Sequence, residues 1–234
     1  MKILAIETAT AASSVALGDD SGVVAMASLL DARGHVEFVI PAVEFCFDRA
    51  GWDPGELDAV AVDVGPGLFS GLRTGLATAQ AIAGAVGVPL IPVSSLDAVA
   101  FDAATGRRRI WGVIDVRRGE VAVCPYRPVP GGVIRDGAVE LCTPDEFKGM
   151  LQEDRSDILV VGEHAALPEG SLVGFHSLKT GRPEHPSAAA VLAIARTRMD
   201  RDDIPHPEDV RPAYLRDPDV TINWSDFRSE GPWS

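Results

Sequence analysis

The feature that most constrains the fold of this sequence is an internal repeat, because the pattern of its first half recurs in its second half. Residues 3–7 form a short apolar run that ends in an acid, and residues 14–17 resume as a strand after a small polar turn. Residues 110–115 also end in an acid, and residues 120–124 follow as a second strand. Each pair predicts a hairpin with a carboxylate at its turn, so we expect two related halves.

Each hairpin is followed by a predicted helix, a buried strand that runs into glycine, and a second helix. This order predicts an α/β fold with two related lobes of mixed sheet covered by helices. We expect lobes at residues 1–104 and 105–216, with the last helix packing back on the first lobe and residues 217–234 forming a flexible tail. The predicted helices are 36–50, 72–86, 143–152 and 187–199, and the predicted buried strands are 59–62 and 158–161. The Thr-Pro-Asp-Glu sequence at residues 143–146 predicts a helix N-cap, and residues 98–109 are expected to form the crossing between the lobes.

Composition places the chain among soluble globular proteins, because 46% of its 234 residues are hydrophobic and 24% are charged. No stretch approaches the roughly 18 uninterrupted apolar residues of a membrane span, and the first residues lack the long apolar run of a signal peptide. We therefore expect a cytoplasmic protein without membrane contact. Cys46, Cys124 and Cys142 lack Cys-x-x-Cys spacing and are expected to be small buried hydrophobic residues.

Charge gives the first indication of function. The net charge is −13 at pH 7, from 34 acidic and 21 basic residues. A net-acidic surface repels the phosphate backbone, so the chain alone is expected to bind nucleic acid poorly. Residues 1–100 hold 12 of the acids and only 4 of the bases. An acidic first half favours a basic protein partner.

Residues 63–75 form a glycine-rich turn between a predicted buried strand and a predicted helix. The amides of Gly65 and Gly67 could hold a phosphate at the helix N-terminus. The turn lacks the lysine of a phosphate-binding loop, however, and its glycines could equally serve turn geometry and close packing. The sequence leaves both interpretations open.

The two first-half helices carry unusual surfaces. Gly71, Gly75 and Ala79 recur at four-residue spacing and make one smooth face, which favours close approach by a helix of the same chain or of another subunit. Helix 36–50 is apolar over more than the stripe of about 100° that one core needs. Either it is sandwiched inside its lobe, or it carries a hydrophobic patch for a partner.

The sequence lacks a recognisable catalytic set. Glu7 stands where an actin-like protein would place a magnesium-holding acid, but the following turn, residues 8–12, contains no glycine. Asp115 ends the corresponding strand, beside arginines that could form a surface ion cluster with it. The histidines make no His-x-x-x-His pair, His35 is expected to cap a helix or face solvent, and Ser70 lacks a Gly-x-Ser-x-Gly context. We predict no catalytic residue, metal or cofactor.

Six motifs occur in order along residues 3–216, and the central Gly-Pro-Gly block is highly specific. They are Ile-Leu-Ala-Ile-Glu-Thr at 3–8, Gly-His-x-Glu at 34–37, Gly-Pro-Gly-Leu-Phe-Ser-Gly-Leu-Arg-x-Gly at 65–75, Val-Ser-Ser-Leu at 93–96, Asp-x-Arg-Arg-Gly-Glu-Val at 115–121 and Pro-x-Tyr-Leu-Arg at 212–216. Together they resemble the bacterial TsaB (YeaZ) family. The sequence departs from the family pattern at residues 63–64, commonly Gly-Arg, and at Leu68 and Ser70, commonly Ser and Thr, which weakens a ligand role for this turn.

The resemblance implies the actin-like ASKHA (ribonuclease H-like) fold and a role in making N6-threonylcarbamoyladenosine, the modified adenosine beside the anticodon of tRNAs that read codons beginning with A. It implies a non-catalytic scaffold and activator that binds the catalytic subunit TsaD through first-lobe helices. It further implies that the ATPase TsaE joins the assembly, that the isolated protein forms a homodimer through the same surface, and that tRNA is reached only through the complex.

The resemblance also places individual residues. The partner surface would comprise Phe38, Val39, Val43, Gly71, Arg73, Thr74, Gly75 and Thr78. A vestigial nucleotide cleft would be lined by Glu7, Gly65, Gly67 and Asp115. Two competing hypotheses remain: an independent actin-like ATP-dependent kinase or ATPase, suggested by the acids and the glycine-rich turn, and a glycoprotease-type peptidase, for which metal ligands are missing.

Overall fold

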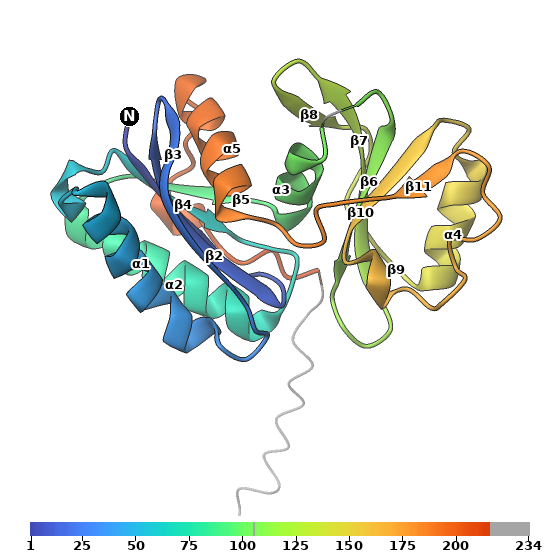
Figure 1. The fold of residues 1–234 in the computed structure, drawn as a ribbon, viewed down its shortest axis with the longest axis horizontal. Coiled ribbons are helices and arrows are strands. Elements are labelled where there is room, and N and C mark those ends of the chain that lie inside the picture. The colour runs from blue at the N-terminus through green and yellow to red at the C-terminus, as the bar shows by residue number, and fades with distance from the viewer. Residues whose placement is uncertain (105, 216–234) are drawn as a thin grey trace, which may run out of the picture.

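The computed structural model describes residues 1–104 and 106–215, which form two lobes side by side (Figure 1). Each lobe is built on one β-sheet, and two helices lie between the sheets: α3 (Ser95–Asp102) and α5 (Ala188–Asp200). The predicted tail, residues 217–234, lies outside the described residues. In the described part of the chain, no helix is both long enough and apolar enough to cross a membrane.

The first sheet contains five strands in the order β3-β2-β1-β4-β5. The strands β1, β2 and β3 pair antiparallel, whereas β4 and β5 run parallel to β1. Because β1 and β4 are parallel neighbours, their carboxyl ends meet at the same edge of the sheet. The bounds are β1 Ile3–Glu7, β2 Ala12–Asp19, β3 Gly22–Leu30, β4 Ala59–Asp63 and β5 Leu90–Val93.

The second sheet repeats this order as β8-β7-β6-β10-β11, with β9 paired to β7. Again three strands pair antiparallel and two run parallel to the first of them. The repeat and the actin-like, ribonuclease H-like α/β fold expected from the sequence are therefore confirmed. The bounds are β6 Arg109–Asp115, β7 Val121–Val129, β8 Gly132–Arg135, β9 Glu140–Cys142, β10 Ile158–Gly162 and β11 Leu178–Thr180.

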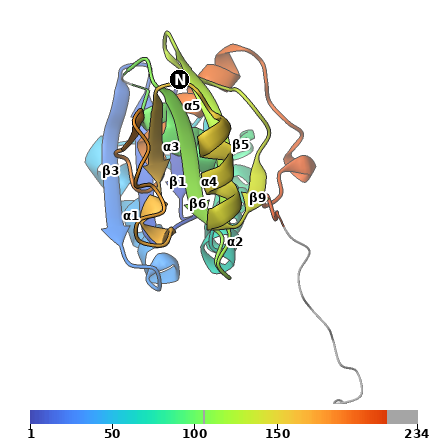
Figure 2. The ribbon, with the colours of Figure 1, turned by 90° about the vertical axis from the view of Figure 1, so that its right-hand side faces the viewer.

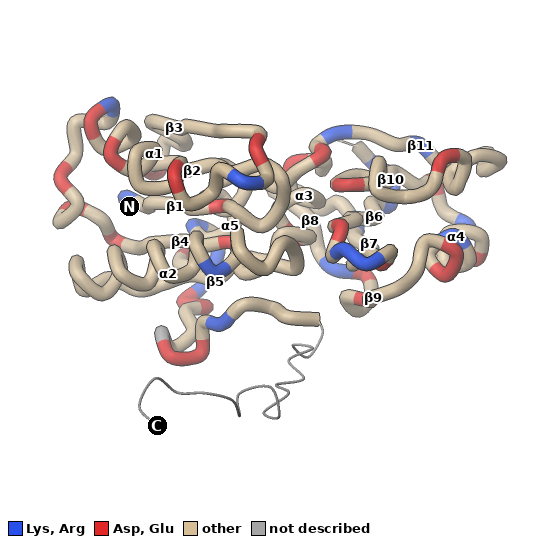
Figure 3. The backbone as a smooth tube through the Cα atoms, turned by 90° about the horizontal axis from the view of Figure 1, so that it is seen from below, with Lys and Arg blue, Asp and Glu red and all other residues tan. Residues whose placement is uncertain are grey.

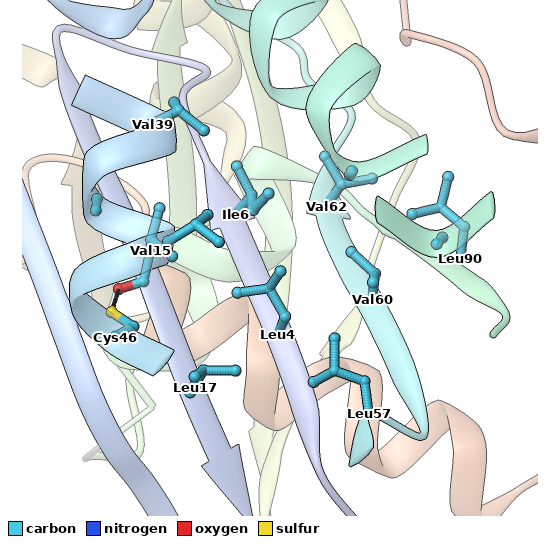
Figure 4. Close-up of a cluster of buried hydrophobic side chains, with 14 of the residues drawn as sticks. Leu4, Ile6, Val15, Leu17, Val39, Cys46, Leu57, Val60, Val62 and Leu90 are labelled. Atoms are coloured by element: carbon cyan, nitrogen blue, oxygen red, sulfur yellow. Dashed lines mark hydrogen bonds between the residues drawn. The ribbon is translucent and has the colours of Figure 1, made fainter. Parts of the chain in front are cut away.

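The first sheet is covered on both faces. The helices α1 (His35–Ala50) and α2 (Phe69–Val86) cover one face, where Leu4 and Ile6 of β1 join their core (Figure 4). Helix α5 covers the other face, where Ile3 and Ala5 of the same strand pack. Alternate side chains of β1 thus enter two different cores, which explains why this strand is apolar at successive positions.

The second sheet is also covered on both faces. Helix α4 (Pro144–Glu153) packs on the outer face through Phe147 and Leu151, and α3 packs on the inner face through Leu96 and Val99. Figure 2, seen from the side of the second lobe, shows α4 in front of α3. The molecule is therefore layered as helices, sheet, helices, sheet and helix.

Local sequence sets the helix ends. The predicted N-cap of α4 is confirmed: the amide of Glu146 donates to Thr143 Oγ1 at 3.3 Å, and the amide of Thr143 donates to the Glu146 carboxylate at 2.7 Å. Helices α1 and α2 end at Gly51 and Gly87, with φ of 66° and 80°. This left-handed conformation favours glycine, which has no Cβ to clash.

Several elements differ from the sequence prediction. Helix α2 begins at Phe69, one turn before residue 72, and Ser95–Asp102 is a helix where we expected only the start of a crossing between lobes. The edge strands β3, β5, β8 and β11 and the short β9 were not predicted. The remaining short elements are 3-10 turns at Pro54–Glu56, His164–Ala166 and Pro207–Asp209.

Candidate functional site

The glycine-rich turn lies directly on the turn between β1 and β2. The amide of Leu68 donates a hydrogen bond to the Ala9 carbonyl oxygen at 2.6 Å. A Cβ on Gly67 would lie 2.1 Å from that same oxygen, so only glycine fits there. Gly65 donates its amide to Asp63 at 2.8 Å. These contacts occupy the turn with the chain's own backbone and support the packing interpretation of its glycines.

Two fully buried carboxylates, Glu7 and Asp63, end the parallel strands β1 and β4. Asp63 Oδ1 accepts hydrogen bonds from Ser95 Oγ at 2.6 Å and from the Gly65 amide, whereas its Oδ2 is buried without a partner among the described residues. Burial raises the pKa of Asp63 to about 7. Burial and the nearby Asp63 also raise the pKa of Glu7 well above its ordinary value. Both carboxyls therefore keep their protons to higher pH than exposed carboxyls do.

The second lobe has a matching pair of acids. Asp115 ends β6, Glu163 follows β10, and the amide of Asp115 donates to the Glu163 carboxylate at 3.0 Å. Burial raises the pKa of Glu163 to about 7. Asp115 forms an ion pair with Arg117 at 3.0 Å, in agreement with a local ion cluster. Glu163 also raises the pKa of Glu7, so the acids of both lobes lie near one another.

We call Glu7, Asp63, Asp115 and Glu163 the acidic junction. The N-terminus of α5 is tied to it, because the Ala188 amide donates to Ser14 Oγ at 2.8 Å and Ser14 Oγ donates to Glu7 at 3.4 Å. Among the residues that the structure describes, no group of three or more His, Cys, Asp or Glu is arranged to hold a metal ion. Through the hydrogen bonds of Ser14, the acidic junction connects β1 to the N-terminus of α5.

Four of the predicted partner residues are buried within the chain. Val39 and Val43 belong to the core beneath α1. A Cβ on Gly71 would lie 2.0 Å from the Thr8 carbonyl oxygen, and one on Gly75 would lie 2.4 Å from Thr8 Oγ1. The smooth face of α2 therefore packs on the chain's own first turn, which leaves little of these four residues exposed to a partner.

The other four predicted partner residues are at least partly accessible. Arg73 is exposed, and Phe38, Thr74 and Thr78 are half-buried. The hydroxyls of Thr74 and Thr78 donate to helix carbonyls one turn earlier, at 3.0 and 2.9 Å. These two threonines therefore add no unpaired hydroxyl to the surface of α2.

The predicted partner residues do not include the most exposed apolar side chains of α1. Val36, Ile40 and Phe45 are 70%, 49% and 45% exposed. On α2, the small residues Ala77, Ala81 and Gly84 are exposed as well. We call this set the helix surface; it comprises Val36, Ile40 and Phe45 of α1 and Ala77, Ala81 and Gly84 of α2. On α1, Val36, Ile40 and Phe45 occupy different positions around the helix from the buried His35, Val39 and Val43. This difference in helical position is the signal that could have identified them.

The end of the described chain returns to the start of α2. Ala213 donates its amide to the Val64 carbonyl at 2.7 Å. The Arg73 guanidinium lies 3.7 Å from the centre of the Phe69 ring, and its Nε donates to the Tyr214 hydroxyl at 3.2 Å. The two rings lie 5.4 Å apart. Arg73 is thus engaged by its own chain, which the motif at residues 212–216 did not predict.

His35 is a buried side chain and not the capping or solvent residue that we expected. It is 3% exposed, and Gly34 occupies the N-cap position of α1. Its Nδ1 lies 2.6 Å from Ser13 Oγ, whereas Nε2 has no partner within the described residues. Burial lowers the pKa of His35, so its neutral form is favoured.

Charged residues are spread over both lobes. Figure 3 shows acidic positions along both lobes, with basic positions scattered among them and no long run of basic residues. Arginines instead pair with nearby acids, as Arg135 does with Asp97 at 2.7 Å and Arg127 with Asp136 at 3.0 Å. Poor nucleic-acid binding by the chain alone stays a prediction.

Comparison with known proteins decides the family. The chain is 32% identical over 220 residues to the tRNA threonylcarbamoyladenosine biosynthesis protein TsaB of Escherichia coli (strain K12), covering 92% of this chain and 95% of that protein. The chain belongs to the TsaB family. The TsaB of Bacillus subtilis (strain 168) is 25% identical over 233 residues, covering 96% and 98% of the two chains. The resemblance stated from the six motifs is confirmed.

Solved structures agree with the TsaB family. One, an uncharacterized protein with similarity to peptidase YEAZ from Pseudomonas aeruginosa, superposes with a TM-score of 0.79 at 27% identity, covering 92% of this chain and 99% of that one. YeaZ from Pseudomonas aeruginosa superposes with a TM-score of 0.78 at 25% identity, covering 91% and 100%. The family model TsaD: tRNA N6-adenosine threonylcarbamoyltransferase matches residues 22–156, so the chain also belongs to that wider family.

Proposed function

We propose that this TsaB-family chain is a partner subunit in the biosynthesis of threonylcarbamoyladenosine in tRNA, where it activates the catalytic subunit TsaD without catalysing the reaction itself. The observation that carries the proposal is the helix surface, in which large apolar side chains of α1 stand exposed beside small residues of α2. The names of the TsaB relatives and the match of residues 22–156 to the TsaD family model support the same process.

The helix surface suits a helical partner. Val36 and Ile40 lie one turn apart on α1, so a partner helix can bury both together. The small residues of α2 let a second backbone approach closely. Glu37 and Glu44 are exposed on the same helix, which favours a partner with basic residues around its apolar contact. Such burial can select one conformer of the partner and thereby activate it.

The acidic junction supports the non-catalytic part of the proposal. Gly67 and Gly71 lie against the carbonyl oxygens of Ala9 and Thr8, where an incoming phosphate would meet acceptors in place of donors. Glu7 accepts hydrogen bonds from the Ala9 amide and Ser14, and Asp63 accepts them from the Gly65 amide and Ser95, so both carboxylates are engaged by the chain's own groups. No observation favours the kinase, ATPase or peptidase hypotheses.

The remaining parts of the assembly are proposals of the same kind. We place TsaE in the assembly through TsaD, and we place tRNA contact in the complex because the isolated chain carries a net charge of −13. In the absence of TsaD, two copies of the chain cover their helix surfaces by forming a homodimer. The homodimer and the heterodimer then compete for one surface.

The test is tRNA threonylcarbamoylation in a reconstituted mixture of TsaD, TsaE, threonylcarbamoyl-adenylate, ATP and tRNA, with and without this protein. We expect modification to require it, although the protein alone turns over nothing. Equal modification in its absence would refute the proposed function.

A pair of matched variants tests the surface. Ile40→Asp places a charge in the apolar contact and is expected to weaken TsaD binding by more than about tenfold, as loss of a central apolar contact does. Ile134→Asp is the control, because Ile134 is similarly exposed, at 42%, but lies on β8 of the second lobe. Equal TsaD affinity of the two variants would contradict the surface assignment.

A further inference from the structure

The second lobe contains a cavity that the proposed function does not use. It has a volume of about 470 Å³ and lies between α4 and the segment that leads into β11. In Figure 1 these elements are at the opposite end of the molecule from α1 and α2. The cavity is therefore available whether or not the helix surface is covered.

The cavity has an apolar floor. Leu151 of α4 and Ile158 of β10 line it and are almost fully buried in the core of the lobe. Phe175 and Leu178, both half-buried against the same core, form the opposite wall. An apolar floor beside an aromatic ring is the usual lining of a site for a small organic molecule.

Basic side chains surround this floor. Lys148 lies one turn before Gln152 on α4, Arg155 follows the helix, and His176 stands on the facing wall. Within the described part of the chain, the side chains of Lys148, Arg155 and His176 form no hydrogen bond or ion pair. Lys148 and Arg155 are thus two unpaired cations beside one cavity, in a chain with a net charge of −13.

The one acid that lines the cavity is already paired. Asp154 Oδ2 accepts a hydrogen bond from Trp111 Nε1 at 2.9 Å and lies 3.3 Å from Arg109. Its side chain is only 5% exposed. Asp154 therefore does not neutralise Lys148 or Arg155, and the cavity favours negative charge.

We propose that this cavity binds a small aromatic anion, with its ring against Phe175 and the apolar floor and its phosphate or carboxylate between Lys148 and Arg155. The volume accommodates one aromatic ring with a charged substituent, within the range of about 300–1,000 Å³ typical of ligand sites. Lys148 and Arg155 supply charge-assisted hydrogen bonds, which are stronger than neutral ones. Ser177 and Gln152 add neutral hydrogen-bonding groups at the rim.

Calorimetric titration of the isolated protein with phenyl phosphate tests this site. We expect saturable binding, weakened about tenfold by Lys148→Gln and by Arg155→Gln, since removing one charged hydrogen bond changes an affinity by about that factor. Lys179→Gln is the matched control, because Lys179 is exposed on β11 but does not line the cavity. Inorganic phosphate, which lacks the ring, is expected to bind more weakly than phenyl phosphate.

The position of binding gives a second readout. On titration with phenyl phosphate, we expect nuclear magnetic resonance shifts at Val173, Phe175 and Leu178. We expect these shifts to disappear in the double variant Lys148→Gln, Arg155→Gln. Absence of saturable phenyl phosphate binding would overturn the proposal. Equal binding by the double variant and by Lys179→Gln would overturn it as well. Neither result depends on TsaD, so the outcome is independent of the proposed function.

Discussion

Replacing Asp63 by Asn is predicted to stabilise the protein above neutral pH. Asp63 is fully buried, and only one of its carboxylate oxygens accepts hydrogen bonds, from Ser95 and Gly65. An Asn side chain keeps an oxygen at that position and carries no charge. It also removes the negative neighbour that raises the pKa of Glu7. Both changes lower the cost of burying the pair.

The size of the stability gain on Asp63→Asn follows from the pKa of Asp63, which burial raises from 3.8 to about 7. A raised carboxyl pKa means that the folded state holds a proton that the unfolded state has lost. The stabilising effect of protonation is thus complete below the unfolded pKa and disappears as the pH rises through about 7. At about 1.4 kcal/mol per pH unit, the advantage of Asp63→Asn grows by about 3 kcal/mol between pH 5 and pH 8.

The assay is urea unfolding followed by tryptophan fluorescence, with Trp111 buried in the second lobe as one reporter. The free energy of unfolding is measured for the protein and for Asp63→Asn across this pH range. Glu169→Gln is the control, because Glu169 is exposed in a loop and its removal changes the net charge equally. A difference between Asp63→Asn and the protein that stays constant with pH would refute the reasoning, as would a less stable variant near pH 8.

Four further substitutions test the packing, the helix cap and one exposed hydrogen bond. In urea unfolding, Gly71→Ala is expected to lower the free energy of unfolding by about 3 kcal/mol, because its Cβ would meet the Thr8 carbonyl. Gly84→Ala has open space around the new Cβ and is expected to raise the free energy of unfolding by about 1 kcal/mol. Thr143→Ala removes the cap of α4 and should cost about 1 kcal/mol in urea unfolding. Tyr214→Phe breaks one exposed hydrogen bond, so its thermal unfolding should change by less than about 1 kcal/mol.

The sequence predicted the elements whose pattern is strongly periodic or continuously apolar. β1 was predicted with its observed bounds at residues 3–7, because it is buried on both faces and ends at a carboxylate. The capping residues of α4 were also identified, because a capping box is a local signal. The repeat then fixed the relation between the halves, since the same order of hairpin, helix and strand occurs twice.

The elements that were missed depend on their surroundings. β3 is an edge strand with side chains that are partly exposed on both faces, so it lacks the alternation of a half-buried strand. The glycines of α2 signalled a close contact, but the contact is the Thr8 turn and not a helix. A sequence shows that a small residue is needed and cannot show what approaches it. The burial of His35 was missed for the same reason, because its partner Ser13 lies on another strand, 22 residues earlier in the sequence.

Helix α5 has a consequence for how the protein is made. It is formed by residues 188–200, yet it covers the face of the first sheet that carries Ile3, Ala5 and Ala61. A ribosome that has synthesised the first sheet still lacks this cover, so that apolar face stays open until the second lobe and α5 have emerged. Folding of the first lobe is therefore completed late in synthesis, and a chain ending before residue 188 is expected to aggregate through this face.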